Sequence, residues 1–258
     1  MSLFFQEQWR YFCTALMFFT RIPVRLTHFK EADLNKATRY FPLVGILVGV
    51  IGALVFWLTS LLLPLSIAVL LSIGATILLT GAFHEDGLAD AADGLGGGLN
   101  KEQVLTIMTD SRIGSYGAIS LIMVLLTKYQ ALSHLAEWTI LVSLIAGHAL
   151  SRLCAVLVMF TQSYVKAQGK AKPLATQLSS GELLAATCFG LAPLGFFSWH
   201  VLIALIPVGW VWWWFSAKIK LRIGGYTGDC LGAMQQLTEI SFYLGLLAST
   251  TIYESYLR

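Results

Sequence analysis

Long apolar segments alternate with short polar ones along the whole chain. A helix rises 1.5 Å per residue, so about 20 apolar residues cross the hydrocarbon core of a bilayer. The cleanest apolar segment, Phe41 to Leu65, contains no charged residue, and Pro64 marks its end. The pattern predicts an all-α, polytopic integral membrane bundle of about six to seven transmembrane helices. The predicted spans are roughly 41–64, 65–84, 115–136, 139–160, 182–199, 201–217 and 236–256.

The N-terminal segment, residues 1–40, differs from these spans because charged residues interrupt it. Glu7 and Arg10 lie inside "MSLFFQEQWRYFCTALMFFTRIP", and no small-residue cleavage site follows, so a cleaved signal peptide is not expected. We predict an amphipathic helix at the membrane interface and, over residues 1–258, a single integral membrane domain. The apolar side of that helix would carry Phe4, Phe5, Trp9, Phe12, Leu16 and Phe19.

Composition supports the assignment to a membrane. Hydrophobic residues make up 57% of the chain and charged residues only 12%, with a mean hydropathy of +0.72. Soluble domains carry about a quarter charged residues. The four cysteines form no CxxC pair, so the sequence indicates neither a zinc site nor a disulfide framework. The net charge of +3 is small, and we expect the lipid bilayer rather than a nucleic acid as the macromolecular environment.

The positive charges are unevenly placed between the apolar segments. Most of the 17 Lys and Arg residues precede the first span or lie at 84–115, 161–181 and 218–235. The short loops around 64–66, 134–138 and 198–200 carry none. Positive loops stay on the cytoplasmic side of the inner membrane. Because those loops also hold the glycine-rich and acidic sequence, we expect the working face to be cytoplasmic.

An acidic cluster, "FHEDGLADAADGLGGG" at 83–98, follows the second span. Asp86, Asp90 and Asp93 fall within a narrow stripe on a helix and extend about 10 Å along its axis. This spacing suits two divalent cations about 4 Å apart, bridged by the middle carboxylate. No basic residue lies between Arg39 and Lys101, and oxygen ligands favour Mg²⁺ or Mn²⁺ over zinc. The alternative interpretation is a solvated acidic end of a helix.

The flanks of the cluster are less informative. Glu85 lies about 100° off the stripe, where it would face solvent. His84 would point away from the aspartates, as a base or as a packing residue at the interface. The sequel "GLGGGLN", with Gly94 and Gly96, is not expected to continue a stable helix. It is either a flexible linker or a loop whose backbone approaches a phosphate or closes over a substrate.

Two further polar motifs lie in loops assigned to the same side of the membrane. "TDSRIGSYG" at 109–117 offers Asp110 as a fourth metal ligand and Arg112 as a phosphate contact, with Ser111 between them. Alternatively, Asp110 or Ser111 caps the next helix and Arg112 snorkels. "GGYTGDCLGAMQQLTE" at 224–239 offers Thr227, Gly228 and Asp229 to a nucleotide or sugar hydroxyl, although Asp229 could instead be a helix N-cap.

Charged residues also occur within the predicted spans. His148 and Arg152 share one helix face, and Arg152 either serves the site or snorkels to the headgroups. Lys128 lies near the middle of a span, and the sequence assigns it no partner. Together, the three motifs favour a two-metal site for diphosphate chemistry at the membrane surface.

In order along the chain, "FHEDGLADAADG", "MTDSRIGSYG" and "GGYTGDCLGA" resemble the cobalamin synthases, the adenosylcobinamide-GDP ribazoletransferases. "FFTRIPV" and "RYFPLVGILVG" fit as well, so the resemblance covers nearly the whole chain. It implies a Mg²⁺-dependent membrane transferase late in cobalamin biosynthesis. A hydroxyl of α-ribazole, or of its 5′-phosphate, would attack the cobinamide-side phosphorus of adenosylcobinamide-GDP. GMP would leave, and adenosylcobalamin or its 5′-phosphate would form.

The resemblance also implies roles for individual residues. Metal on the diphosphate would be held by Asp86, with a direct part in catalysis, and by Asp90, Asp93 and Asp110. Arg112 would stabilise charge as GMP departs, and Glu85 is a candidate acceptor of the hydroxyl proton. The expected substrate contacts are Ser111, Gly94, Gly96, Thr227, Gly228 and Asp229. A homo-oligomer, or an association with other enzymes of corrinoid synthesis, would be compatible with such a protein.

Two other functions fit parts of the pattern. A prenyltransferase or a CDP-alcohol phosphotransferase would also bind Mg²⁺-diphosphate through aspartates. The latter family has an Ala-Arg step in its motif, whereas Asp90 follows Ala89 here. A cofactor transporter would place its carboxylates near the middle of the membrane on broken helices, which the predicted cytoplasmic loops disfavour.

Overall fold

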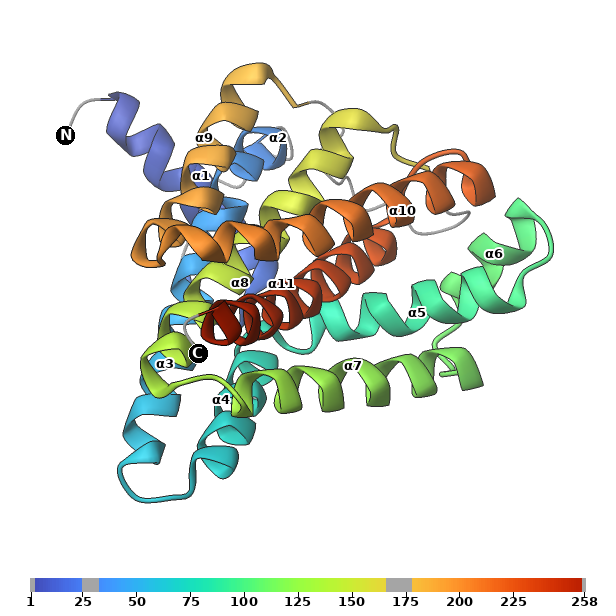
Figure 1. Ribbon diagram of the computed structural model, residues 1–258. Coiled ribbons are helices and arrows are strands. Elements are labelled where there is room, and N and C mark those ends of the chain that lie inside the picture. Colours follow the sequence, from blue (N-terminus) through green and yellow to red (C-terminus); the bar gives the residue numbers. More distant parts are fainter. Residues whose placement is uncertain (1–2, 25–32, 166–177, 257–258) are drawn as a thin grey trace.

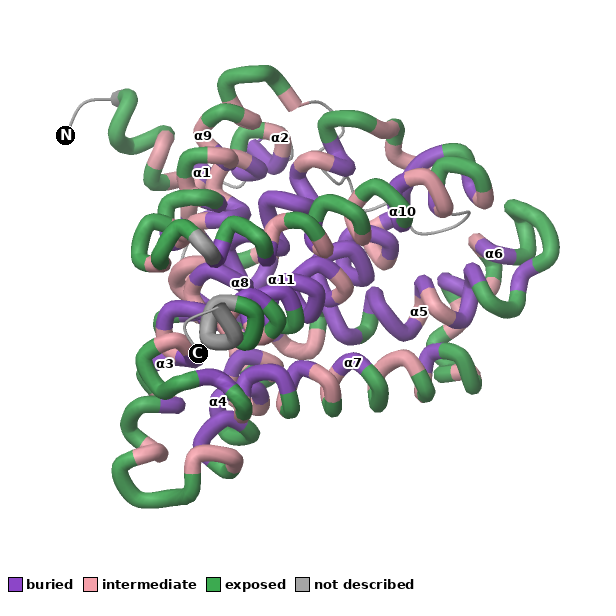
Figure 2. Tube along the Cα trace, in the orientation of Figure 1, coloured by how far each residue is buried: buried purple, intermediate pink, exposed green. Residues whose placement is uncertain are grey.

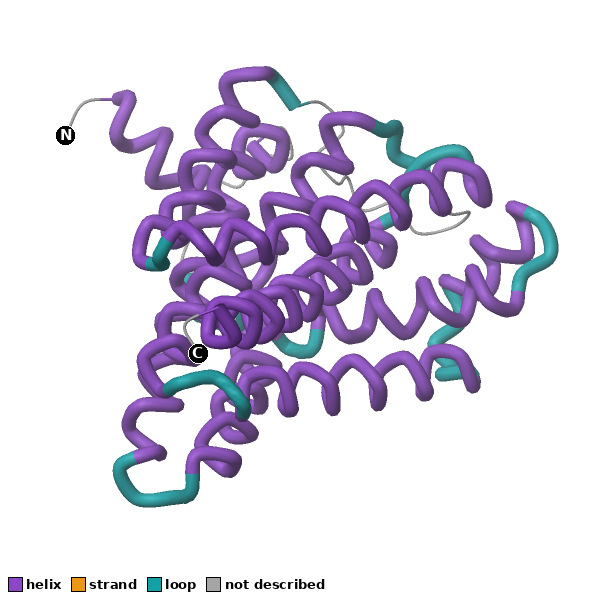
Figure 3. Tube along the Cα trace, in the orientation of Figure 1, coloured by secondary structure: helices purple, strands orange, loops and turns teal. Residues whose placement is uncertain are grey.

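Helices make up nearly all of the computed structural model, which describes residues 3–24, 33–165 and 178–256 (Figure 1, Figure 3). Within these ranges no strand forms, and the only β-type pairing is an isolated parallel bridge between Tyr164 and Tyr226. The predicted all-α membrane bundle is confirmed. The lysines of the segment 161–181 lie outside the described residues, as does part of the N-terminal segment.

The helices follow one another along the chain from α1 to α11, as the colours of Figure 1 show. The elements are α1 Leu3–Phe19, α2 Asp33–Ala37, η1 Thr38–Tyr40, α3 Phe41–Ser60, α4 Leu65–Thr80, α5 Phe83–Gly97, α6 Lys101–Met108, α7 Ser115–Ser133, α8 Glu137–Thr161, α9 Ser180–Leu191, η2 Ala192–Phe196, η3 Trp199–Ala204, α10 Leu205–Ile223 and α11 Gly228–Tyr256.

Fewer helices qualify as membrane spans than the hydropathy pattern predicts. Among the described residues, Asp33–Ser60, Glu137–Thr161 and Val201–Ile223 are long and apolar enough to cross a bilayer. Counting the bent pair α4 and α5 as one crossing gives four. The number falls below six to seven partly because α9 has only 12 residues before η2 interrupts it. In addition, α7 and α11 carry buried polar side chains that lower their hydropathy.

Helix α8 lies at the centre of the bundle, and most of its side chains are buried (Figure 2). Helix α3 approaches it through glycines: a Cβ on Gly45 would lie 2.3 Å from the carbonyl oxygen of His148. A Cβ on Gly49 would lie 2.5 Å from Cα of Ile145. Small residues four apart allow membrane helices to pack backbone to backbone, so this pair of glycines fixes α3 on α8.

A tight left-handed turn separates α4 from α5. Gly81 and Ala82 have φ values of 68° and 57°, which bend the two helices by 86°. Positive φ is ordinary for glycine and costly for alanine. The Arg21 N–H donates to the carbonyl of Leu79 (2.8 Å) and so ties the end of α1 to this turn. As a result, α5 leaves the direction of the α4 span and runs alongside α7 (Figure 1).

The α3–α8 contact gives a direct test of the packing. Gly45→Ala should destabilise the protein by about 1–3 kcal/mol, because the added methyl group collides with backbone that cannot move aside. Gly74→Ala is the matched control, since a Cβ on Gly74 would meet nothing within 4 Å. Thermal unfolding of the two detergent-solubilised variants measures the difference, and equal melting temperatures would contradict the packing argument.

Candidate active site

The acidic site forms where α5 crosses α11. At this point Gly87 faces Gly232, and a Cβ on Gly87 would lie 3.1 Å from Cα of Asp229. The backbones therefore touch, and the first turn of α11 is held beside the aspartate face of α5. Asp86 is exposed, whereas Asp90 and Asp229 are half-buried. The structure thus joins the first and third sequence motifs through three carboxylates.

These carboxylates repel one another. Burial, together with the charges of Asp229, Asp86 and Asp93, raises the pKa of Asp90 to about 7. Burial raises the pKa of Asp229 to about 6, helped by the charge of Asp86 and opposed by a hydrogen bond from Thr227. In the part of the chain that the structure describes, neither Asp86, Asp90 nor Asp229 forms an ion pair. The group therefore holds uncompensated negative charge.

Asp93 has a different role from its neighbours on the stripe. Its two carboxylate oxygens accept hydrogen bonds from the backbone N–H groups of Gly114 (2.7 Å) and Gly117 (2.8 Å). Asp93 is buried and fastens the start of α7 to α5. No group of three or more His, Cys, Asp or Glu side chains among the described residues is arranged to hold a metal ion as it stands. The spacing thus predicted correctly that the aspartates share a face. It did not predict that both oxygens of Asp93 accept backbone hydrogen bonds.

The second motif places its charges in an exposed pair. The Arg112 guanidinium donates to both oxygens of Asp110, at 2.6 Å to Oδ2 and 3.1 Å to Oδ1, and lowers the pKa of that carboxyl to about 2. Arg112 is 87% exposed. The alternative that Asp110 or Ser111 caps the next helix is wrong, because the N-cap of α7 is Gly114. The metal and phosphate roles of Asp110 and Arg112 stay predictions, as does a substrate contact by Ser111.

The glycine-rich sequel is helical as far as Gly97, so the prediction that its glycines do not continue the helix is wrong for 94–97, while 98–100 form a short loop. Helix α5 continues to Gly97 because its glycines pack against other helices. A Cβ on Gly94 would lie 2.9 Å from the carbonyl oxygen of Val104, and one on Gly96 would lie 2.7 Å from the ring of Tyr116. Tertiary contacts thus outweigh the low helix propensity of glycine. Gly94 and Gly96 face protein in this structure rather than an open phosphate loop.

The third motif begins α11 and leaves Asp229 available. Thr227 lies at the N-cap, where its hydroxyl accepts the backbone N–H of Cys230 (3.3 Å). The alternative interpretation of Asp229 as N-cap is therefore wrong, since Asp229 lies in the first turn that follows Gly228. Upstream, Tyr226 exchanges backbone hydrogen bonds with the segment after α8, donating to Ser163 and accepting from Val165. These bonds fix where the helix starts and hence where the Asp229 carboxylate lies.

Comparison with known proteins decides the family. A family model described as cobalamin-5-phosphate synthase matches residues 11–247. The chain belongs to this family. An adenosylcobinamide-GDP ribazoletransferase from Ralstonia pickettii (strain 12J) is 50% identical over 249 residues, covering 94% of this chain and 97% of the relative. The proteins of the same name from Shewanella frigidimarina and Vibrio cholerae O395 are 47% and 46% identical, covering 94% and 96% of this chain and 95% and 97% of their own. No solved structure matches.

Beneath the aspartates of this cobalamin-5-phosphate synthase family member lies a buried ionic network that the sequence did not predict. Glu239 forms an ion pair with Lys128 (3.0 Å), lies 3.3 Å from Nδ1 of His148 and accepts a hydrogen bond from Tyr243 (3.1 Å). Gln236 accepts a hydrogen bond from Lys128 (3.0 Å). A mid-span lysine needs a buried partner. Apart from Glu254, Glu239 is the only acidic residue in the last predicted span, and this signal could have identified it.

Glu85 and His84 belong to this interior, so the expectation that Glu85 faces solvent is wrong. Gln236 donates to one oxygen of Glu85 (2.9 Å), which is only 8% exposed. His84 points away from the aspartates and stacks on Phe19, with ring centroids 5.5 Å apart. Arg152 donates to the backbone oxygen of His148 (2.9 Å) and does not snorkel, because it is 2% exposed.

The repulsion at Asp90 predicts a pH dependence of stability. A carboxyl whose pKa is raised from 3.8 to about 7 favours the folded state while it is protonated. The protein without divalent cations should therefore lose stability as pH rises from about 4 to about 7. Asp90→Asn should flatten this part of the profile. Thermal unfolding across that range in EDTA measures it, with Glu102→Gln, an exposed change on α6, as the control. An unchanged slope in Asp90→Asn would contradict the assignment.

Proposed function

We propose that this protein transfers α-ribazole, or its 5′-phosphate, to adenosylcobinamide-GDP. The products are GMP and adenosylcobalamin or its 5′-phosphate. The observation that carries the proposal is the group of three carboxylates, Asp86, Asp90 and Asp229, gathered from two helices of a cobalamin-5-phosphate synthase family member and forming no ion pair with any residue that the structure describes. The shared name of the relatives supports this reaction over prenyl transfer, CDP-alcohol chemistry or transport.

Magnesium fits the donor set of this site. Carboxylate oxygens are the ligands that Mg²⁺ and Mn²⁺ prefer, and the charges of Asp86, Asp90 and Asp229 repel one another without a counter-ion. When bound, one or two ions would neutralise the diphosphate and polarise its phosphorus–oxygen bonds. Asp93 contributes by holding α7, and with it the loop of Asp110 and Arg112, against α5.

The chemistry is a substitution at phosphorus. An oxygen–phosphorus bond forms between the ribazole hydroxyl and the cobinamide-side phosphate, the bond to the GMP oxygen breaks, and the hydroxyl proton passes to a base. A carboxylate of Asp90 or Asp229 is better placed for that proton than Glu85, whose side chain faces the interior. We therefore assign Glu85 to positioning α5 through Gln236. Arg112, exposed at the surface, would stabilise the departing GMP.

The location follows from the distribution of charge. The loops that carry the acidic and glycine-rich motifs, 84–115 and 218–235, contain lysines and arginines, whereas the short loops around 64–66, 134–138 and 198–200 contain none. Positive loops remain in the cytoplasm, so we place the carboxylates at the cytoplasmic face of the inner membrane. There the nucleotide-activated substrate is soluble and within reach.

Activity of the purified protein tests the function. In the presence of Mg²⁺, adenosylcobinamide-GDP and α-ribazole, the protein in nanodiscs should release GMP and form a corrinoid product, both followed by chromatography. EDTA should stop the reaction. Asp86→Asn and Asp229→Asn should lower kcat by at least about 100-fold. Each variant loses a ligand of the metal ion that would neutralise the negative charge of the transition state. Glu102→Gln should keep full activity. Absence of metal-dependent GMP release would refute the proposal.

Asp93 should behave differently from the other aspartates. Asp93→Asn replaces an acceptor of two backbone hydrogen bonds by a group that can accept only one of them. The variant should lose about 1–3 kcal/mol of stability, whereas Asp86→Asn should not. Thermal unfolding in EDTA separates the two effects, since no metal can then contribute. Equal stability of Asp93→Asn and wild type would show that Asp93 does not fasten α7.

A further inference from the structure

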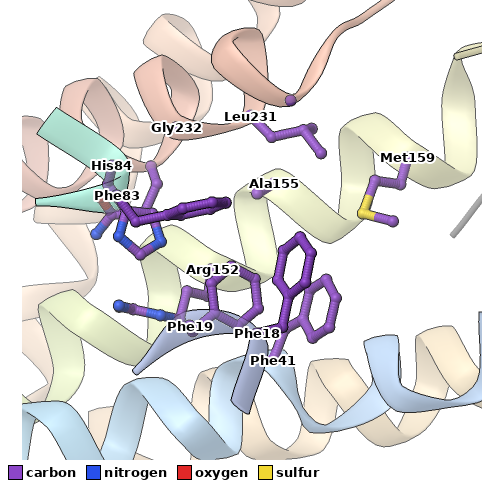
Figure 4. Close-up of a pocket in the computed structure, with 12 residues that line it drawn as sticks. Phe18, Phe19, Phe41, Phe83, His84, Arg152, Ala155, Met159, Leu231 and Gly232 are labelled. Atoms are coloured by element: carbon purple, nitrogen blue, oxygen red, sulfur yellow. The ribbon is translucent and has the colours of Figure 1, made fainter. Parts of the chain in front are cut away.

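An aromatic cavity lies beside the acidic site, between α1, α3, α5, α8 and α11. Figure 4 shows the rings of Phe18, Phe19, Phe41 and Phe83 converging with Leu231 and Met159 around one space. The empty space between the side chains is about 400 Å³ with its mouth included, although the part wide enough to seat a water molecule is only about 20 Å³. Phe83 is 40% exposed and packs edge-on against Phe18 and Phe19, so its ring lies at the entrance, and a ligand that enters would displace it.

Two walls of the aromatic cavity lead directly to the carboxylates. Gly228 lines the cavity and immediately precedes Asp229. Phe83 lies in the same first turn of α5 as Asp86. If a flat aromatic ring of a ligand lay between these walls, the group attached to that ring would lie close to Asp86 and Asp229. The cavity therefore lies next to the reaction site and shares the first turns of α5 and α11 with it.

The aromatic cavity also contains polar atoms without partners. His84 and Arg152 line it and are only 4% and 2% exposed. Among the described residues, Nε2 of His84 and Nε of Arg152 are buried and make no hydrogen bond. Buried polar atoms are nearly always paired, so two orphans beside an aromatic space indicate that a ligand completes them. Each can donate one hydrogen bond to a ring nitrogen, His84 as the Nε2–H tautomer.

We infer that the aromatic cavity binds the benzimidazole base of the ribazole acceptor, an inference that rests on the proposed function. Benzimidazole is flat and largely apolar, and in the nucleoside it keeps a single free ring nitrogen, which matches phenyl walls with one or two donors. Guanine, the other base in the reaction, presents several donors and acceptors that these walls would leave unpaired. A base in the aromatic cavity directs its ribose hydroxyls towards Asp86 and Asp229.

Binding measured apart from turnover tests the inference. Isothermal titration calorimetry of the protein in nanodiscs gives one Kd for α-ribazole and another for adenosylcobinamide-GDP with Mg²⁺. Phe83→Ala removes a stacking ring, and Ala155→Leu fills the space from α8. Each should raise the Kd for α-ribazole about tenfold and change that for adenosylcobinamide-GDP less than about twofold. Phe196→Ala, at a 71% exposed position on η2, is the matched control.

The outcomes separate this inference from the proposed function. If wild type binds α-ribazole and releases GMP while both variants keep wild-type affinity, the aromatic cavity is not the base site and the function stands. A loss confined to adenosylcobinamide-GDP would assign the cavity to guanine and overturn the inference. So would a phospholipid found by native mass spectrometry in wild type but not in Ala155→Leu, with α-ribazole binding unchanged. A wild type that binds neither substrate would overturn both proposals.

Discussion

The backbone contact between α5 and α11 is the constraint on which the rest of the site depends. Gly87 and Gly232 lack side chains, so the two helices touch where any larger residue would hold them apart. Only at that separation do carboxylates that are far apart in the sequence share one patch of surface. The same contact brings the wall of the aromatic cavity up to Asp229. The close contact between α5 and α11 thus produces both the concentration of negative charge and the position of the aromatic cavity.

The buried ionic network of Lys128, Gln236 and Glu239 stabilises the contact between α5 and α11 from the interior of the bundle. Gln236 donates to Glu85 on α5, and Lys128 on α7 pairs with Glu239 on α11, so buried side chains join three helices. A buried ion pair is a poor source of net stability but a strong determinant of which groups face one another, because any other arrangement leaves a charge unpaired. We read the network as the element that sets the register of α11 against α5 and α7.

Periodicity and charge patterning are sufficient to predict the all-α membrane fold of this chain. The spacing of Asp86 and Asp90 predicted their common face, and the third motif supplied Asp229, because short motifs encode local geometry directly. Asp93 could not be assigned correctly, since its partners, Gly114 and Gly117, arrive through a fold that the spacing does not contain. The glycine run was misjudged for a related reason: its helix is stabilised by neighbouring helices and not by propensity. The pairing of Lys128 with Glu239 was not predicted, because the sequence does not show that α7 and α11 are in contact.

Helix α5 has a consequence for how the protein is made. Four of its 15 residues are glycine, so the segment has little tendency to be helical before it is packed. Its main support is α11, which leaves the ribosome long after α5. The group of carboxylates is therefore assembled only after α11 has been made, and a nascent chain that ends before α11 carries Asp86 and Asp90 without Asp229. Such timing keeps an unfinished chain from binding nucleotide diphosphates or metal ions while it is still being inserted.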